Sequence, residues 1–254
     1  YFTHRFEQPL DAIDESANSL FGLDSTAVPA FGFTYGITDK LYANIYRSPL
    51  CQTGLCRTIE MGFGYHWLDE AGRSPVALST YASVEGDDNF RHQFTYNLQL
   101  MVGRSITRHV NVFFSPAAHI NANGNGRFNP RPGFLPPALL QDFRLGQHSG
   151  SFGFGLNARI RPTASLLFEY TPRVGFKLGR LRIINDPNTG QLLRLENDSE
   201  AEIGFGIEKR IGRHVFSLTF SNTQTTTTSR YNSSNQALPP NKFAIGFNIF
   251  RRLL

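Results

Sequence analysis

The histidines and serines are the residues that could perform nucleophilic chemistry in this chain. A serine hydrolase needs a serine, a histidine and an orienting polar group that meet on one side of the fold. His214 and Ser217 are close in sequence, but an odd spacing along an extended strand puts them on opposite faces. No Gly-x-Ser-x-Gly nucleophile elbow occurs. The sequence therefore predicts no catalytic residue, and we expect that the protein is not an enzyme.

Two histidines lie among aromatic residues and could hold a cofactor. His4 stands between Phe2 and Phe6, and His214 precedes Phe216. Two imidazoles about 10 Å apart, on strands two places from each other, could just admit a haem or a metal ion. The alternative is that each histidine lies beside an aromatic belt at a membrane interface. We favour this alternative and predict neither a cofactor nor a bound metal.

The two cysteines, Cys51 and Cys56, enclose the residues Gln-Thr-Gly-Leu shortly after Ser48 and Pro49. No histidine or acidic residue nearby completes a metal-binding set. A disulfide in an outer loop suits this turn-rich segment if the protein is exported, because thiols oxidise outside the cytosol. A free, reduced pair is the alternative, and no neighbouring residue indicates a redox site.

Apolar and polar side chains alternate with a period of two along most of the chain. Phe152, Phe154 and Leu156, for example, are separated by Gly153 and Gly155. A strand has this pattern when its two faces meet different surroundings. The pattern predicts about twelve strands, roughly at residues 1–7, 29–38, 41–48, 57–69, 75–86, 91–106, 110–122, 149–161, 165–180, 199–211, 214–228 and 241–253.

The connections between these predicted strands alternate in length. Short ones lie at 39–40, 71–74, 107–109, 162–164 and 212–213, and long ones at 8–28, 49–56, 87–90, 123–148, 181–198 and 229–240. Bacterial outer-membrane barrels have an even number of strands, tight periplasmic turns and larger outer loops. The sequence therefore predicts an all-β fold, a closed antiparallel transmembrane β-barrel that forms a single domain over residues 1–254 in the bacterial outer membrane.

The composition agrees with such a barrel. The chain has 23 Phe and 23 Gly but only two Met, and its mean hydropathy is −0.27. No apolar run reaches the 18 residues of a membrane helix, as expected where lumenal residues dilute lipid-facing ones. Residues 1–6 already have the strand pattern, so we expect the mature form of an exported protein.

The charge of the chain indicates which partners to expect. The formal net charge is +5, but the basic residues do not form one patch. Arg108, Arg161 and Arg213 fall at predicted strand ends, where they can contact the phosphates of outer-membrane lipids and lipopolysaccharide. We therefore expect lipid partners and no nucleic acid.

The alternation also assigns the two faces of the barrel. Leu98, Phe168, Phe176 and Phe216 have the lipid-facing parity. The lumenal parity contains Glu60, Glu85, His119, Arg159, Glu169, Arg173, Lys177, Glu202 and Glu208. We expect the last six of these to form one inward network across strands eight to ten. Such an interior is either a salt-bridged plug or the wall of a narrow aqueous pore.

Segment 123–148 interrupts the strand pattern with many glycines and prolines. It either folds inward as a constriction or stays outside as a lid, and the sequence does not choose between these alternatives.

Several strings of residues resemble a known family. They are Thr3-His4-Arg5-Phe6, Leu20-Phe21-Gly22-Leu23-Asp24-Ser25, Tyr35-Gly36-Ile37-Thr38-Asp39, and the segment from His214 to Asn222. Over most of its length the chain resembles a family of uncharacterised bacterial outer-membrane barrels, a domain of unknown function. The resemblance implies a barrel and no particular activity, and the cysteine pair is not associated with it.

The sequence leaves three functions open. We predict a narrow passive channel for small solutes, because glycines such as Gly153, Gly155, Gly204 and Gly206 widen the interior. The first alternative is a structural scaffold or anchor with a blocked lumen, which binds a protein partner at its loops or turns. The second is an outer-membrane lipid-modifying enzyme, since twelve-stranded phospholipase barrels carry a Ser–His–polar triad on the outside.

Overall fold

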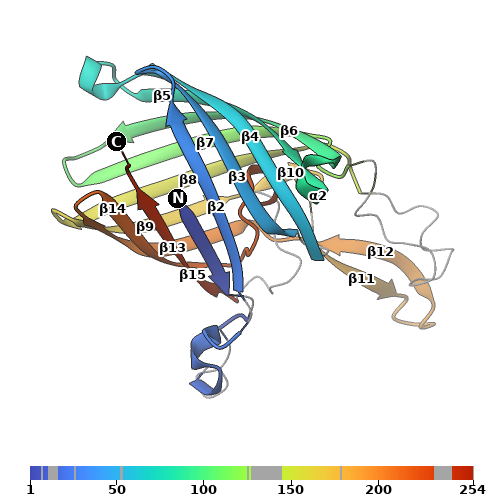
Figure 1. Ribbon diagram of the computed structural model, residues 1–254. Coiled ribbons are helices and arrows are strands. Elements are labelled where there is room, and N and C mark those ends of the chain that lie inside the picture. Colours follow the sequence, from blue (N-terminus) through green and yellow to red (C-terminus); the bar gives the residue numbers. More distant parts are fainter. Residues whose placement is uncertain are drawn as a thin grey trace.

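In a computed structural model, the chain forms a closed β-barrel (Figure 1). The structure describes residues 1–6, 8–10, 17–25, 27–51, 54–124, 126, 145–177, 179–231 and 242–253. The strands are β1 (Phe2–Phe6), β2 (Ala27–Gly36), β3 (Leu41–Cys51), β4 (Gly54–Leu68), β5 (Ala77–Gly86), β6 (His92–Ser105), β7 (Val110–Ile120), β8 (Ser149–Arg161), β9 (Ala164–Thr171), β10 (Arg173–Gly175), β11 (Arg180–Asn185), β12 (Leu192–Asp198), β13 (Glu202–Ile211), β14 (His214–Ser221) and β15 (Ala244–Arg251). Within the described ranges the single-turn elements are η1 (Leu20–Gly22), η2 (Glu70–Gly72), α2 (Asp87–Phe90) and α4 (Thr228–Tyr231).

The wall of the barrel is a single antiparallel sheet of thirteen strands in the order β10-β8-β7-β6-β5-β4-β3-β2-β1-β15-β14-β13-β9, and pairing of β8 with β9 closes it. The strands β9 and β10 are consecutive parts of one spanning strand, so the wall has twelve spanning strands. The first and last strands meet with Phe2 opposite Ile249. The predicted twelve-stranded antiparallel barrel is therefore confirmed.

One spanning strand is shorter than the sequence pattern predicted. Pro172 separates β9 from β10, because proline has no N–H for the sheet. Gly175 then turns the chain with a φ of +76°, and the strand ends there rather than at residue 180. The prediction that Phe176 faces lipid is therefore wrong. Phe176 is buried against Ala122 and Leu145.

The outer connections also differ from the prediction. Residues 181–198 were predicted to form a long connection, and most of this connection is a separate hairpin of β11 and β12 that projects from the barrel (Figure 1). The expected loop 49–56 is mostly strand, since Leu50 pairs with Leu55 and Cys51 with Gly54. The cysteine side chains lie outside the described part of the structure, so the disulfide between them stays a prediction. Most of segment 123–148 lies outside it as well.

The outer face of the wall carries the large apolar side chains, as the alternation predicted. Leu98 is 59% exposed, and the exposed positions include Phe31, Phe63, Phe154, Phe168, Phe205 and Leu218. In an outer-membrane barrel this band contacts the lipid chains. Among the described residues, no helix is both long enough and apolar enough to cross a membrane.

Two carboxyl groups outside the spanning strands hold connections in place. In the turn after β4, Glu70 accepts hydrogen bonds from the N–H (3.1 Å) and hydroxyl (2.7 Å) of Ser105. These bonds hold the pKa of Glu70 below its ordinary value. At the loop end, burial raises the pKa of Asp87, although Arg230 and a hydrogen bond from Thr58 oppose this shift.

Candidate functional site

The lumenal side chains become more exposed from the loop end of the barrel to the turn end. Along β6, Thr95 and Asn97 are buried, Met101 is partly exposed, and Ser105 is exposed. The same gradient holds along β3, β4, β8 and β13. Outer-membrane barrels place short turns in the periplasm. The inner half of this lumen is therefore open toward the periplasm, whereas the outer half is filled.

Among the residues that the structure describes, 222–231 fill this outer half, and we call them the plug segment. The pattern predicted that the strand from 214 would continue to residue 228, but β14 ends at Ser221. Asn222 ends it by bonding β13 twice: its N–H donates to the carbonyl of Ile203 (3.2 Å), whose N–H donates to Asn222 Oδ1 (3.0 Å). Beyond this point, Thr223, Thr225, Thr227, Ser229 and Arg230 are at most 2% exposed. The plug segment thus lies inside the barrel.

Two carboxylates on neighbouring strands hold the plug segment. Glu60 accepts hydrogen bonds from the N–H (3.0 Å) and the hydroxyl (2.6 Å) of Thr228. Glu85 accepts bonds from the hydroxyl of Thr227 (3.0 Å) and from the N–H (2.5 Å) and hydroxyl (2.7 Å) of Ser229. Both carboxylates are 2% exposed. Hydrogen bonds to buried charged groups are the strong ones, so these contacts form a polar latch.

Two buried arginines complete the closure. Arg173 donates through Nη2 to the carbonyl of Ser229 at 2.9 Å, and its charge attracts that of Glu85. Arg230 donates through Nη1 to the carbonyl of Ala122 at 2.9 Å and is attracted by Glu85 and Asp87. Positive and negative groups are thus buried together, as a low-dielectric interior requires.

Next to the latch, the structure forms a Ser–His–Asn chain that the sequence analysis did not find. The Nε2 atom of His119 lies 3.0 Å from Ser151 Oγ, and its Nδ1 atom lies 2.8 Å from Asn97 Oδ1. The amide of Asn97 in turn donates to Glu85 at 2.8 Å. This order of groups matches a serine hydrolase triad. The signal is invisible in sequence, because strand register alone brings β6, β7 and β8 together.

Burial argues against catalysis by this chain of residues. Ser151 is 1% exposed and His119 is fully buried, both at the level of the plug segment. A nucleophile must reach its substrate, and a lipid cannot reach this serine through the closed outer lumen. The hydrogen bonds that link Ser151, His119, Asn97 and Glu85 instead satisfy the buried polar groups of β5, β6, β7 and β8 on the filled side of the barrel.

We expect the wild-type barrel to remain unlabelled by a fluorescent fluorophosphonate, a probe that reacts with activated serines. Ser151→Ala should give the same blank lane in gel fluorescence, because Ser151 is out of reach. Hydrolysis of a fluorogenic phosphatidylcholine by the folded protein should match the background. Labelling of the wild type that disappears in Ser151→Ala would show that the triad is active.

The predicted network of six lumenal charges is wrong as a single network. Arg159 lies opposite Ser165 near the turns and is exposed, whereas Lys177 lies beyond the far end of β10. Along the barrel axis, Glu169 lies between Arg159 and Lys177, and Glu208 is partly exposed in the inner half. Arg173 and Glu202 are buried near the plug segment, where Ser221 donates to Glu202 at 3.1 Å. Shared parity fixed the face, but not the depth, of these residues.

The two histidines considered as ligands lie at different depths. His4 pairs with Phe247, which is opposite Leu218 on β14, and His214 is four residues farther along that strand. The offset adds roughly 13 Å to the spacing across the strands, so the two rings are too far apart to share a ligand. The ring of His4 stacks on Phe247 at 4.7 Å, and His214 stacks on Phe216 at 5.8 Å. Among the described residues, no group of three or more His, Cys, Asp or Glu residues could hold a metal ion.

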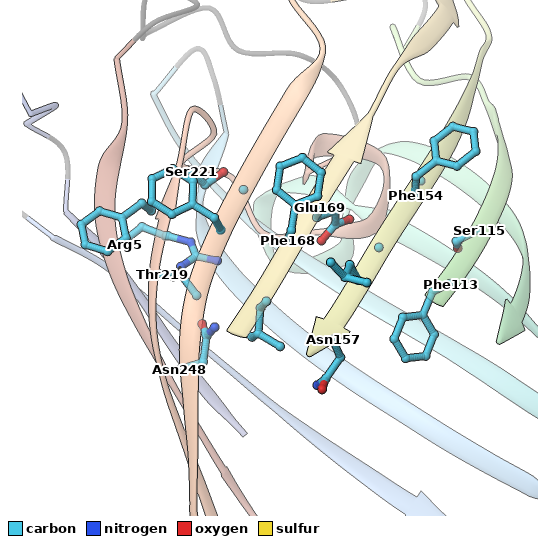
Figure 2. A pocket seen from close by; sticks show the side chains of 17 residues that line it. Arg5, Phe113, Ser115, Phe154, Asn157, Phe168, Glu169, Thr219, Ser221 and Asn248 are labelled. Atoms are coloured by element: carbon cyan, nitrogen blue, oxygen red, sulfur yellow. Dashed lines mark hydrogen bonds between the residues drawn. The ribbon is translucent and has the colours of Figure 1, made fainter. Parts of the chain in front are cut away.

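The open inner half contains two cavities that share Arg5 and Asn248. One has a volume of about 390 Å³ and is lined by tyrosines and polar residues, including Tyr1, Tyr42, Asn44, Tyr46, Tyr81 and Gln99. The other, of about 340 Å³, reaches across to β8 and β9 (Figure 2). Gly153, Gly155 and Gly204 line this second cavity, so these glycines do leave space in the lumen.

The fold resembles those of several solved structures. The chain is similar to the NanC porin, with a TM-score of 0.56, 8% identity and 99% of both chains covered. It is also similar to outer membrane phospholipase A from Escherichia coli (TM-score 0.47, 11% identity, 99% of this chain and 89% of that chain) and to LpxR from Salmonella typhimurium (TM-score 0.39, 13% identity, 99% of both chains). At these identities the likeness concerns the fold alone.

No curated protein sequence matches the chain. A family model described as a membrane bound beta barrel domain, DUF5777, matches residues 1–253. The match covers nearly the whole chain, and the closed barrel with its apolar outer band agrees with it. The chain therefore belongs to this family of membrane-bound β-barrels and is an outer-membrane barrel protein.

Proposed function

We propose that the protein is a narrow passive channel for small solutes, and that the plug segment is its gate. The observation that carries this proposal is that hydrogen bonds hold the plug segment in the lumen. Thr227, Thr228 and Ser229 are held by hydrogen bonds to Glu60 and Glu85. Water can replace each of these bonds when the segment moves, so opening the lumen leaves none of these donors and acceptors unpaired.

The composition of the plug segment supports this reversible closure. Residues 222–230 are Asn, Thr, Gln, Ser and Arg throughout, and no apolar side chain would be exposed if they left the barrel. In the open inner half, the 390 Å³ cavity is lined by Thr226 and Thr228 and so offers a wet path up to the segment. We further propose that arginines at the turns, such as Arg108 and Arg213, contact lipid or lipopolysaccharide phosphates.

A reversible lock tests the gate directly. The Oγ atom of Ser48 lies 3.3 Å from Oγ1 of Thr226, so Ser48→Cys with Thr226→Cys can join the plug segment to β3 by a disulfide. Cys51 and Cys56 are replaced by Ser in this variant and in its control, which keeps Ser48 and Thr226. We expect liposomes containing the control to swell in arabinose whether oxidised or reduced, and the locked variant to swell only after reduction. Swelling that is the same in the oxidised and reduced locked variant contradicts the gate.

A scaffold with a blocked lumen is the second candidate, and the filled outer half favours it. Ser48, Thr58, Thr95, Ser151 and Glu202 come from five strands around the barrel, and each is at most 2% exposed. Such a belt suits a permanently closed barrel as well as a closed gate. Liposomes with correctly folded control protein that never take up arabinose would support the scaffold and reject the channel.

A further inference from the structure

Arg5 is a buried cation placed between the two inner cavities. It extends from β1 into the lumen, lines both cavities and is only 7% exposed. The glycine at position 246 makes room for it, because a Cβ atom there would collide with the guanidinium. Figure 2 shows Arg5 beside Thr219 and Asn248, with Glu169 across the cavity. The fold thus keeps a positive charge inside the solute path.

The polar groups around Arg5 are not fully satisfied by the protein. Its Nη1 atom donates to the hydroxyl of Thr219, a neutral partner, and its buried Nε atom has no hydrogen-bond partner. The buried Oδ1 atom of Asn248, on the same cavity walls, has no partner either. Unsatisfied buried groups of this kind are costly and call for an explanation. A bound solute would supply the missing partners.

The carboxylates that line the two cavities are hydrogen-bonded to other groups than Arg5. Glu60 lines the same 390 Å³ cavity, but its oxygens accept bonds from Ser83 (2.7 Å), Tyr81 (3.2 Å) and Thr228. Glu169 lies on the opposite wall of the other cavity, where Thr171 donates to it. A buried guanidinium is stabilised by a directly bonded anion, and among the described residues Arg5 bonds the neutral hydroxyl of Thr219 instead of a carboxylate.

We propose that Arg5 and Asn248 form a binding site for a small organic carboxylate that bears hydroxyl groups. This inference rests on the proposed channel function and names its solute class. The planar guanidinium matches a carboxylate in geometry, and Oδ1 of Asn248 accepts from a hydroxyl. The amides of Asn44 and Gln99 and the rings of Tyr1 and Tyr42 line the rest of the cavity. Its volume of about 390 Å³ lies in the range of small-molecule sites.

Isothermal titration calorimetry with D-glucuronate and D-glucose, which differ by the carboxylate, tests the site. In the detergent-solubilised wild type we expect D-glucuronate to bind at least about tenfold more tightly than D-glucose, as loss of one charged hydrogen bond implies. Arg5→Gln should remove this preference. Asn248→Asp should remove it too, because the new carboxylate becomes the counter-ion of Arg5. Arg210→Gln, at an exposed position near the turns, should retain the preference.

The heat-dependent gel shift of barrels establishes that each variant is folded, and Asn248→Asp tests the site with Arg5 intact. Equal affinity of the wild type for both sugars, or an unchanged preference in folded Arg5→Gln, overturns the proposal. Binding takes place from the open inner half and does not require the plug segment to move. A barrel that binds D-glucuronate but never conducts therefore refutes the channel and supports the carboxylate site. A barrel that conducts but does not prefer D-glucuronate over D-glucose refutes the carboxylate site and supports the channel.

Discussion

Glu85→Gln is expected to open the outer half of the barrel. The carboxylate of Glu85 accepts three hydrogen bonds from Thr227 and Ser229 in the plug segment. A glutamine lacks the charge and turns an NH2 group toward donors of the segment, so at least one buried donor loses its acceptor. The cost is about 2 kcal/mol or more, which corresponds to a roughly thirtyfold increase in the open fraction.

Single-channel recording in planar bilayers measures this fraction. Glu60→Gln should act in the same direction, since Glu60 holds Thr228. Glu208→Gln is the matched control, because Glu208 is a lumenal carboxylate in the open inner half. On the neighbouring strands it lies opposite Ser165 and Ser217. The control should conduct like the wild type. Identical records for Glu85→Gln and Glu208→Gln, from equally folded barrels, would show that the carboxylates do not latch the segment.

The second large effect concerns the two faces of β6. Leu98 lies near the middle of this strand and is 59% exposed on the lipid side, whereas Met101 lines the 390 Å³ cavity. An arginine facing the middle of the bilayer costs about 2–4 kcal/mol, and one in a wet lumen costs far less. Leu98→Arg should therefore lower the free energy of unfolding by that amount, and Met101→Arg should leave it within about 1 kcal/mol of the wild type.

Urea unfolding of the barrel in phospholipid vesicles, followed by the fluorescence of Trp67, gives both values. The two substitutions introduce the same side chain on the same strand, so they differ only in the face and level on which it stands. If Met101→Arg proves the more destabilising of the two, the assignment of faces along β6 is reversed.

The alternation of side chains was sufficient to predict the barrel, its strand number and the apolar outer face of its wall. Parity is a local property, and Glu60, Glu85 and His119, which have the lumenal parity, are buried in the structure. The depth of each residue along the barrel and its hydrogen-bond partners could not be predicted from parity. His119 meets Asn97 and Ser151 only through the register of three strands, and register depends on the whole sheet.

The plug segment was missed although the sequence carried a signal for it. The alternation of side chains predicts one strand over residues 214–228, and the threonines of its second half also favour a strand. The positions that follow Phe216, Leu218 and Phe220 on the lipid-facing parity are Asn222 and Gln224, however. An amide side chain is costly in contact with lipid chains. The change from Phe to Asn and Gln at these positions marks the point where the chain leaves the wall.

The latch also bears on how the barrel folds. The bond between Thr227 and Glu85 spans 142 residues, and that between Thr228 and Glu60 spans 168. Contacts between such distant residues form only after the chain between them has been ordered, because loop closure costs entropy first. The plug segment also lies between the last two spanning strands, β14 and β15, so its enclosure coincides with the joining of β15 to β1. Assembly of the wall therefore precedes sealing of the lumen, and a partly assembled barrel is an open one.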